Sequence, residues 1–312
     1  MSHNNEHNHS DESQHRHSHG EVNGENLLFA TILNFTITIV EIVGGIISGS
    51  FALLSDALHN FGDTIAVFLA YISNKISKRS PTSEKTFGFK RVQILAAMIN
   101  GLAMAVISIY IVIEAYHRFK NPQPINGAMM VVIASICLLA NFIAMSILYN
   151  DKEKNLNIKA AYLHLLSDTL SSVAVIIGGI LIYFYKVYWL DPLITFIIAI
   201  YVFRETWFIL KQAYLILIQA APTELDLKKV KQAIELLNEV ENVHHLHAWK
   251  LDDKENHFEC HVDLKTDLHI SQTENVLFKI KQILTEDFNL SHSTIQFEYN
   301  CCSDKSMIKN TI

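Results

Sequence analysis

The sequence predicts an all-α membrane domain of six transmembrane helices followed by a small water-facing α/β domain. Half of the 312 residues are apolar and only 18% are charged, and the mean hydropathy is positive, which is unusual for a soluble protein. The charge is also unevenly distributed. Residues 222–312 hold 10 Lys and Arg against 16 Asp and Glu, whereas residues 1–221 hold 15 of each. An acidic, separate C-terminal domain is therefore expected.

The N-terminal residues 1–24 are expected to be a disordered, His-rich tail in the cytoplasm. They lack a basic segment followed at once by an apolar core, so they do not resemble a secretory signal peptide. Two interpretations of the tail remain open, a weak and dynamic collector of metal ions or a disordered segment without effect on the protein's function. Its histidines are His3, His7, His9, His15, His17 and His19.

Six apolar segments within residues 25–211 are long enough to cross a hydrocarbon core, which needs about 20 helical residues. They are 27–48, 51–74, 92–116, 127–149, 160–184 and 190–210. The loops after the second and fourth segments, with their flanks, carry nine Lys and Arg, against three on the opposite side. Because Lys and Arg resist translocation, both termini are expected in the cytoplasm.

Residues 212–312 are expected to form the cytosolic domain. Hydrophobic periodicity predicts helices at 225–237 and 272–286 and strands at 243–251, 257–264 and 293–299. This order suggests a small sandwich with both helices on one face of the sheet. The four cysteines show no framework spacing, so a disulfide-linked extracellular domain is not expected.

The second and fifth apolar segments share a His-x-x-x-Asp motif, at His59/Asp63 and at His164/Asp168, offset by 105 residues in both cases. A His and an Asp four residues apart lie on one face of a helix. If the two helices face each other, they present two imidazoles and two carboxylates to one point. That number and type of ligands suit tetrahedral Zn²⁺.

Ionisable groups inside a membrane cost about 2.5–3.5 kcal/mol each on insertion scales, which favours a function for them. The structural alternative is that each His–Asp pair is an internal hydrogen bond that joins helices. Two matched pairs favour metal ligands over that alternative. Five other polar residues in these segments could line a path or bridge helices, and Asp56 is the best candidate to support His59. The five are Glu41, Asp56, Asn100, Glu114 and Asn141.

Several longer stretches resemble the cation diffusion facilitator family, in its zinc-transporting branch. They are GGIISGSFALLSDALHNFGD, TFGFKRVQILAAMINGL, HLLSDTLSS, LDPL, VHHLHAW and STIQFEY. The resemblance implies a homodimer of six-helix protomers with metallochaperone-like, ferredoxin-like cytosolic domains. It also implies export of cytoplasmic Zn²⁺ in exchange for protons by alternating access, and the compact chain favours a bacterial inner membrane.

Carried over by position, the family's transport ligands fall on His59, Asp63, His164 and Asp168. In the cytosolic domain its metal-binding positions fall on His244, His261 and Glu298, with His247 as a further candidate. Gln296 stands where some bacterial relatives have a His, and Cys301 and Cys302 are spaced unlike the family's C-terminal cysteines. The loop between the second and third segments has no His, so no metal is expected there.

Strand alternation is expected to place His245 and His247 on one face of the sheet and His244 on the other, so that they do not all serve one ion. The alternative for this cluster is a set of solvated histidines on a polar face. His257, Cys260 and His261 follow on the next strand.

Two other functions are alternatives to transport. An intramembrane metalloenzyme would keep an open water position on the metal and a nearby base, and no such base accompanies the motifs. A metal sensor with a membrane anchor would need no ligands inside the membrane. We therefore expect a secondary transporter and no enzyme, with metal ions, protons, the lipid bilayer and a second copy as partners. No nucleic acid and no cofactor besides the transported ion are expected, and Co²⁺, Cd²⁺, Fe²⁺ and Mn²⁺ remain open beside Zn²⁺.

Overall fold

The computed structural model describes residues 24–149, 156–300 and 305–308. Residues 1–23 of the predicted tail and the pair Cys301 and Cys302 lie outside the described residues. The chain divides into two compact units, one made of Met1–Ala57 and Gln123–Asp191 and the other of Leu58–Pro122 and Pro192–Ile312. Each unit is described by itself.

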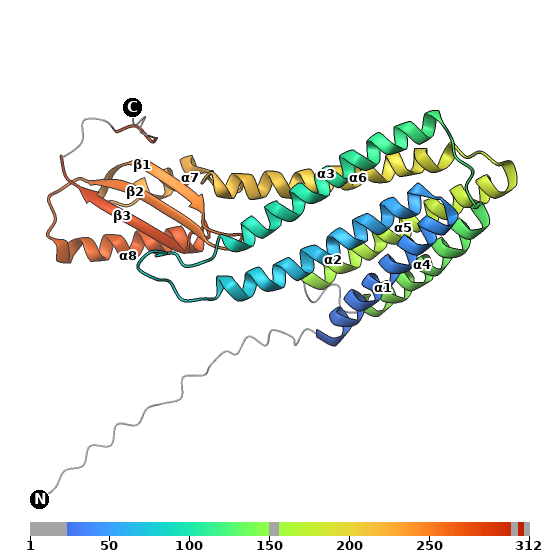
Figure 1. Cartoon of the computed structure of the whole chain (residues 1–312). Helices are drawn as coiled ribbons and strands as arrows, with labels where there is room; N and C mark the ends of the chain where they lie inside the picture. The colour runs from blue at the N-terminus through green and yellow to red at the C-terminus, as the bar shows by residue number, and fades with distance from the viewer. Residues whose placement is uncertain (1–23, 150–155, 301–304, 309–312) are drawn as a thin grey trace, which may run out of the picture. The chain divides into compact units, whose positions relative to one another are not determined.

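Each of the six predicted apolar segments lies in a long helix (Figure 1). The helices are α1 (Gly24–Ser48), α2 (Phe51–Ser77), α3 (Val92–Lys120), α4 (Gly127–Leu148), α5 (Leu156–Tyr185) and α6 (Leu190–Leu217). Among the described residues, four helices are long and apolar enough to cross a membrane, namely α3, α4, α6 and the part of α5 from Tyr162 to Tyr185. In α2 the ionisable residues Asp56, His59 and Asp63 interrupt the apolar stretch.

The first unit contains α1, α4, α5 and the first turns of α2 (Figure 1). The helices α4 and α5 approach closely where two glycines meet. A Cβ atom added to Gly127 would lie 2.7 Å from the carbonyl oxygen of Gly179, which is closer than side chains tolerate. A similar approach joins α1 to α4, because a Cβ on Gly44 would meet Ile133 at 2.6 Å. Small residues therefore allow the close helix packing that membrane helices use.

The start of α2 is determined by a carboxylate from elsewhere in the chain. Asp191, at the beginning of α6, is completely buried. It accepts hydrogen bonds from the Ser50 hydroxyl at 2.5 Å, from the Phe51 N–H at 2.8 Å and from the Ala52 N–H at 3.3 Å. A carboxylate satisfies the unpaired N–H groups at a helix N-terminus and opposes the helix dipole there.

The second unit contains α2 from Leu58 onward, α3, α6 and the α/β domain. Gly62 on α2 faces Met104 on α3, and Gly101 on α3 faces Leu210 on α6, again with too little room for a Cβ atom. The helix α6 continues to Leu217, past the expected end of the segment at residue 210. The extension begins with the polar residues Lys211 and Gln212, which is why the apolar segment is expected to end at residue 210.

The C-terminal region folds as a small α/β domain (Figure 1). Its elements are α7 (Leu227–Glu235), β1 (Val240–Lys250), β2 (Asn256–Leu264), α8 (Ile270–Glu286) and β3 (His292–Glu298). The sheet order is β1-β2-β3, with β1 antiparallel and β3 parallel to β2. The apolar core lies between the sheet and the two helices, which contact each other as well as the strands. The predicted elements all exist, with ends that differ by up to three residues.

Within the second unit, the loop before α3 contacts the α/β domain. Lys90 forms an ion pair with Glu255 in the turn between β1 and β2. The ring of Phe87 meets the His257 ring edge to face, with centroids 5.5 Å apart. These contacts attach the loop to the same end of the sheet as the β1–β2 turn.

Candidate metal centres

The first His–Asp pair lies on α2 in the second unit. His59 Nε2 is 3.4 Å from Asp63 Oδ2, and the two side chains are 17% and 35% exposed. The spacing of four residues accounts for the approach, because one helical turn separates them on the same face. The distance is longer than that of a good hydrogen bond, so the two atoms are neighbours that do not form a strong bond with each other.

The second pair lies on α5 in the first unit and repeats this geometry. His164 Nε2 is 3.5 Å from Asp168 Oδ2, and the Asp168 side chain is only 2% exposed. One turn further along α5, the Ser171 hydroxyl donates a 2.8 Å hydrogen bond to Asp56 Oδ1 at the start of α2. Asp56 therefore has a neighbour of its own on α5, in addition to its place beside His59 in the sequence.

Both separations match what two ligands of one zinc ion require. Zinc binds imidazole nitrogen and carboxylate oxygen at about 2.0–2.2 Å, so two such atoms on a tetrahedral ion are about 3.4 Å apart. The pairs at 3.4 and 3.5 Å meet that condition without rearrangement. Each pair therefore has the separation of two ligands of one zinc ion.

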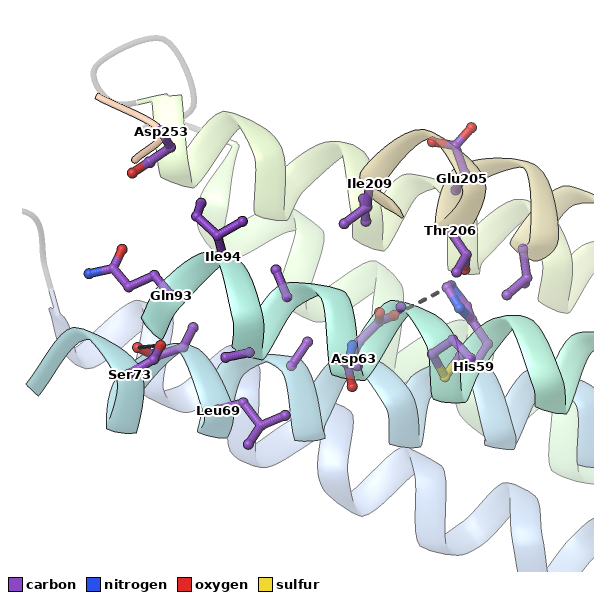
Figure 2. A pocket seen from close by; sticks show the side chains of 18 residues that line it. His59, Asp63, Leu69, Ser73, Gln93, Ile94, Glu205, Thr206, Ile209 and Asp253 are labelled. Carbon is purple, nitrogen blue, oxygen red and sulfur yellow. Dashed lines mark hydrogen bonds and ion pairs between the residues drawn. The ribbon is translucent and has the colours of Figure 1, made fainter. Parts of the chain in front are cut away.

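A cavity of about 410 Å³ opens from the first pair within the second unit (Figure 2). Its walls are mostly apolar, and the uncharged polar residues among them are Ser73, Gln93, Asn100 and Thr206. Ser73 lies ten residues beyond Asp63 on α2, which is about 15 Å along the helix. Figure 2 shows His59 and Asp63 at one end of the cavity and Ser73 and Gln93 at the other. The cavity thus follows the helices away from the pair.

A carboxylate of the α/β domain lines the far end of this cavity. Asp253, in the turn between β1 and β2, lies near Gln93 in Figure 2. Glu205 on α6 is a second carboxylate of the lining, at the end near His59. Sequence motifs did not predict either residue. The only available signal for Asp253 was an acidic turn, which is common on protein surfaces without any function.

The cytosolic candidates His244, His261 and Glu298 come together on the sheet. Each offers a ligand atom, and these atoms lie within 4.8 Å of one another. His244 Nε2 is 3.3 Å from Glu298 Oε2, and His261 Nδ1 is 2.7 Å from Glu298 Oε1. The register explains this, because His244 pairs with His261 across β1 and β2, and Glu298 lies at the end of β3.

Gln296 contacts the cluster through Glu298. Its amide donates a 2.8 Å hydrogen bond to Glu298 Oε1, so it orients the carboxylate, as a partner outside the ligand set commonly does. Cys260 lies next to His261 on β2, but burial raises the pKa of its thiol to about 12. A thiol that stays protonated does not offer the thiolate that metals bind.

The expected alternation along β1 is wrong at His245. The register shifts between His244 and His247, so that two residues of β1 lie opposite one residue of β2. His245 has a φ of 53°, in the left-handed region, which costs a residue other than glycine about 1–2 kcal/mol. The centroid of its ring lies 4.6 Å from that of His261 and 5.1 Å from that of His247. The bulge therefore brings His245 beside the cluster rather than away from it.

Comparison with known protein families shows which family this chain belongs to. Residues 27–218 match the cation efflux transmembrane domain, and residues 222–300 match the cytoplasmic domain of cation efflux proteins. The chain belongs to the cation diffusion facilitator family. This cation efflux protein is a transporter and not an enzyme, and it is a multi-pass membrane protein.

Curated relatives are similar in sequence to this chain over most of their length. The protein is 39% identical over 285 residues to the cadmium, cobalt and zinc/H(+)-K(+) antiporter of Bacillus subtilis (strain 168), covering 90% of this chain and 91% of the relative. It is 38% identical over 296 residues to the zinc transporter ZitB of Escherichia coli (strain K12), covering 92% and 93%. The expected resemblance to the zinc-transporting branch is confirmed by these relatives.

A solved structure of a relative matches part of this chain. It is described as the metal-bound C-terminal domain of the CzcD transporter from Cuprividus metallidurans, and it is 34% identical to this cation efflux protein. The match covers 24% of this chain and 99% of that chain, with a TM-score of 0.22.

Proposed function

We propose that this protein exports a divalent metal cation, with Zn²⁺ as the favoured ion, from the cytoplasm in exchange for protons. The transport site is formed by His59, Asp63, His164 and Asp168 acting together on one tetrahedral ion. The observation that carries this proposal is the geometry of the two His–Asp pairs, at 3.4 and 3.5 Å on α2 and α5. The names of the relatives, which include a zinc transporter and a zinc antiporter, support the choice of ion.

Protons and zinc compete for the same atoms of this site. Zinc needs neutral imidazole and ionised carboxylate, so protonation of either weakens its hold on the metal. An imidazole ordinarily titrates between pH 6 and 7, close to the conditions on the two sides of a cell membrane. Metal binds when the site faces the near-neutral cytoplasm, and protonation of His59 or His164 releases it on the other side.

The cavity in the second unit supplies the cytoplasmic half of the path. Three carboxylates, including Asp63, and several uncharged polar groups line it, and it extends from the His59–Asp63 pair toward the α/β domain. A cation drawn to Asp253 enters a passage whose walls carry no Lys or Arg among the lining residues. Movement of helices around the site, with α1 to α6 all spanning the bilayer, then opens it to the other side.

The cytosolic domain serves regulation and assembly in this proposal. His244, His261 and Glu298 bind a second metal ion, with His247 nearby, on a ferredoxin-like domain that pairs with a second copy. The protein is then a homodimer in a bacterial inner membrane with both termini in the cytoplasm. The match to the cytoplasmic domain of cation efflux proteins supports this arrangement.

Flux measurements on the purified protein test the proposed transport. Proteoliposomes with a zinc-sensitive dye inside are given external Zn²⁺, with the interior either more acidic than the exterior or at equal pH. An acidic interior should accelerate zinc entry through inside-out molecules and raise the internal pH as zinc enters. Zinc uptake that ignores the pH gradient would refute proton exchange, and no uptake at all would refute export.

A further inference from the structure

The cytosolic cluster has three convergent ligands, which is one fewer than a closed zinc site has. A tetrahedral ion bound by His244, His261 and Glu298 keeps one coordination position open. Structural zinc sites fill all four positions with protein atoms, whereas open positions are typical of sites that do chemistry or pass the ion on. The residue beside the open position therefore decides which kind of site this is.

We propose that His245 supplies the fourth ligand, and that the cytosolic site is a closed tetrahedral site of three imidazoles and one carboxylate. This inference rests on the proposed cytosolic metal site and extends it by one residue. The His245 ring already lies against that of His261, at 4.6 Å between centroids. Rotation about the side-chain torsions, without movement of the strand, can direct its nitrogen at the ion.

The backbone at His245 supports a function for this residue. A bulge with its first residue in the left-handed region normally has glycine there, because glycine adopts that conformation without a steric cost. Here the position holds a histidine at a φ of 53°. Backbone strain of this kind is commonly retained where it orients a functional side chain. In this bulge it turns the imidazole toward the cluster.

The bulge is hydrogen-bonded to a segment outside the sheet that contains Ser306 and Met307. The His245 N–H donates a 3.2 Å hydrogen bond to the Ser306 carbonyl, and the Leu246 N–H donates a 2.8 Å hydrogen bond to the Met307 carbonyl. Lys305, in the same segment, lies 2.8 Å from Asp263 on β2. These bonds hold the strained backbone of the bulge, so that only the His245 side chain has to rotate when a metal binds.

His247 provides the matched comparison. It lies two residues away on the same strand, is partly buried like His245, and packs against the His245 ring at 5.1 Å. If any nearby imidazole could complete the site, the two residues would be interchangeable. The proposal instead assigns the ligand to His245 and leaves His247 outside the coordination sphere.

Cobalt binding to the full-length protein in detergent tests this assignment. Four-coordinate Co²⁺ absorbs visible light much more strongly than five- or six-coordinate Co²⁺, so the spectrum reports the ligand number. Subtraction of the spectrum of a His244→Ala variant removes the contribution of ions bound elsewhere on the chain. The variants to compare are His245→Gly, which suits the left-handed backbone, and His247→Ala.

We expect His245→Gly to lose the strong tetrahedral bands and to bind Co²⁺ at the cytosolic site at least ~100-fold more weakly, since losing even an outer-shell partner costs 10–100-fold. Its melting temperature without metal should be unchanged or higher, because glycine relieves the strain. Free imidazole should restore the bands in His245→Gly by filling the vacated position. His247→Ala should behave as the unmodified protein.

Unchanged bands and affinity in His245→Gly, with a clear loss in His244→Ala, would overturn the role of His245 while leaving the cytosolic site in place. Loss of the bands in His247→Ala but not in His245→Gly would show that His247 is the fourth ligand and that the proposal is wrong. An absent signal in all of these proteins would refute the cytosolic site itself. Zinc flux through the membrane domain is measured separately, so none of these outcomes depends on the transport proposal.

Discussion

The N–H of Phe51 donates a 2.8 Å hydrogen bond to Oδ2 of Asp191, so a buried carboxylate at the start of α6 caps the helix that carries His59 and Asp63. The Ser50 hydroxyl and the Ala52 N–H bond the other oxygen of the same carboxylate. The Asp191 carboxylate thus caps the N-terminus of α2 together with the Ser50 hydroxyl, which accepts a 3.3 Å hydrogen bond from the Leu53 N–H.

We expect Asp191→Ala to lower the melting temperature of the detergent-purified protein by several degrees, because it leaves helix N–H groups without an acceptor. Loss of an N-cap costs about 1 kcal/mol, and the full burial of Asp191 makes the cost larger. Asp267→Ala, in an exposed loop of the cytosolic domain, is the control. Equal melting temperatures of the two variants would show that Asp191 does not stabilise α2.

Removal of either transport carboxylate is expected to abolish zinc flux. Asp63→Ala and Asp168→Ala each delete a charged ligand from the proposed site. Both variants should reach the membrane in normal amounts and elute as folded protein. The measurement is initial zinc uptake by proteoliposomes, and uptake at the unmodified rate in either variant would contradict the four-residue site.

His59→Asp is expected to change selectivity more than turnover. The variant site has one imidazole and three carboxylates, a harder and more anionic ligand set that accepts larger ions of higher coordination number. The ratio of Zn²⁺ to Cd²⁺ flux should fall, and its pH dependence should move to lower pH because an aspartate is a weaker base than a histidine. The test compares both metals at several internal pH values. The same ratio and the same pH profile would show that His59 is not a ligand.

Asp253→Asn is expected to raise the KM for zinc with kcat unchanged. Asp253 lies at the far end of the cavity from the His–Asp pair, where it attracts the ion but does not hold it during transport. An exposed charge contributes roughly 0.6 kcal/mol to such an attraction, which is about threefold in KM at low ionic strength. The effect should vanish in high salt, because salt screens exposed charges. Asp267→Asn is the matched control, and a fall in kcat would contradict a role limited to attraction.

The stability of the cytosolic domain is expected to fall as the pH drops below about 7. Burial lowers the pKa of His257, and the neighbouring His292 acts in the same direction, as does Lys90, whereas Glu255 and Asp252 oppose the shift. The folded protein therefore binds fewer protons at His257 than the unfolded chain does. The contribution of His257 to the free energy of unfolding rises with pH between its lowered pKa and the ordinary value of 6.5. This contribution is lost as the pH falls through that window.

His257→Gln should flatten this pH dependence, because glutamine does not titrate. The measurement is the melting temperature between pH 5 and 8, with His117→Gln on the exposed end of α3 as the control. A slope in His257→Gln as steep as in the control, or steeper, would contradict the assignment to His257.

Local interactions explain why the sequence alone determined so much of this protein. The six long helices follow from runs of apolar residues, and the His–Asp pairs follow from a spacing of four residues on a helix, which brings the side chains together in any surroundings. The strands and helices of the α/β domain were predicted for the same reason. The helix ends were less accurate, as in α6, whose last turns contain polar residues.

The tertiary structure decided the features that depend on residues far apart in the chain. Asp191 caps α2 from 140 positions away, Gln296 orients Glu298 beside a histidine from another strand, and Asp253 reaches the cavity from the α/β domain. His245 shows the difference most clearly. Alternation along an isolated strand turns it away from His244, and only pairing with β2, together with hydrogen bonds to Ser306 and Met307, creates the bulge that reverses it. Spacing in a sequence determines contacts within one helix, whereas strand register and loop position arise only when the whole chain packs.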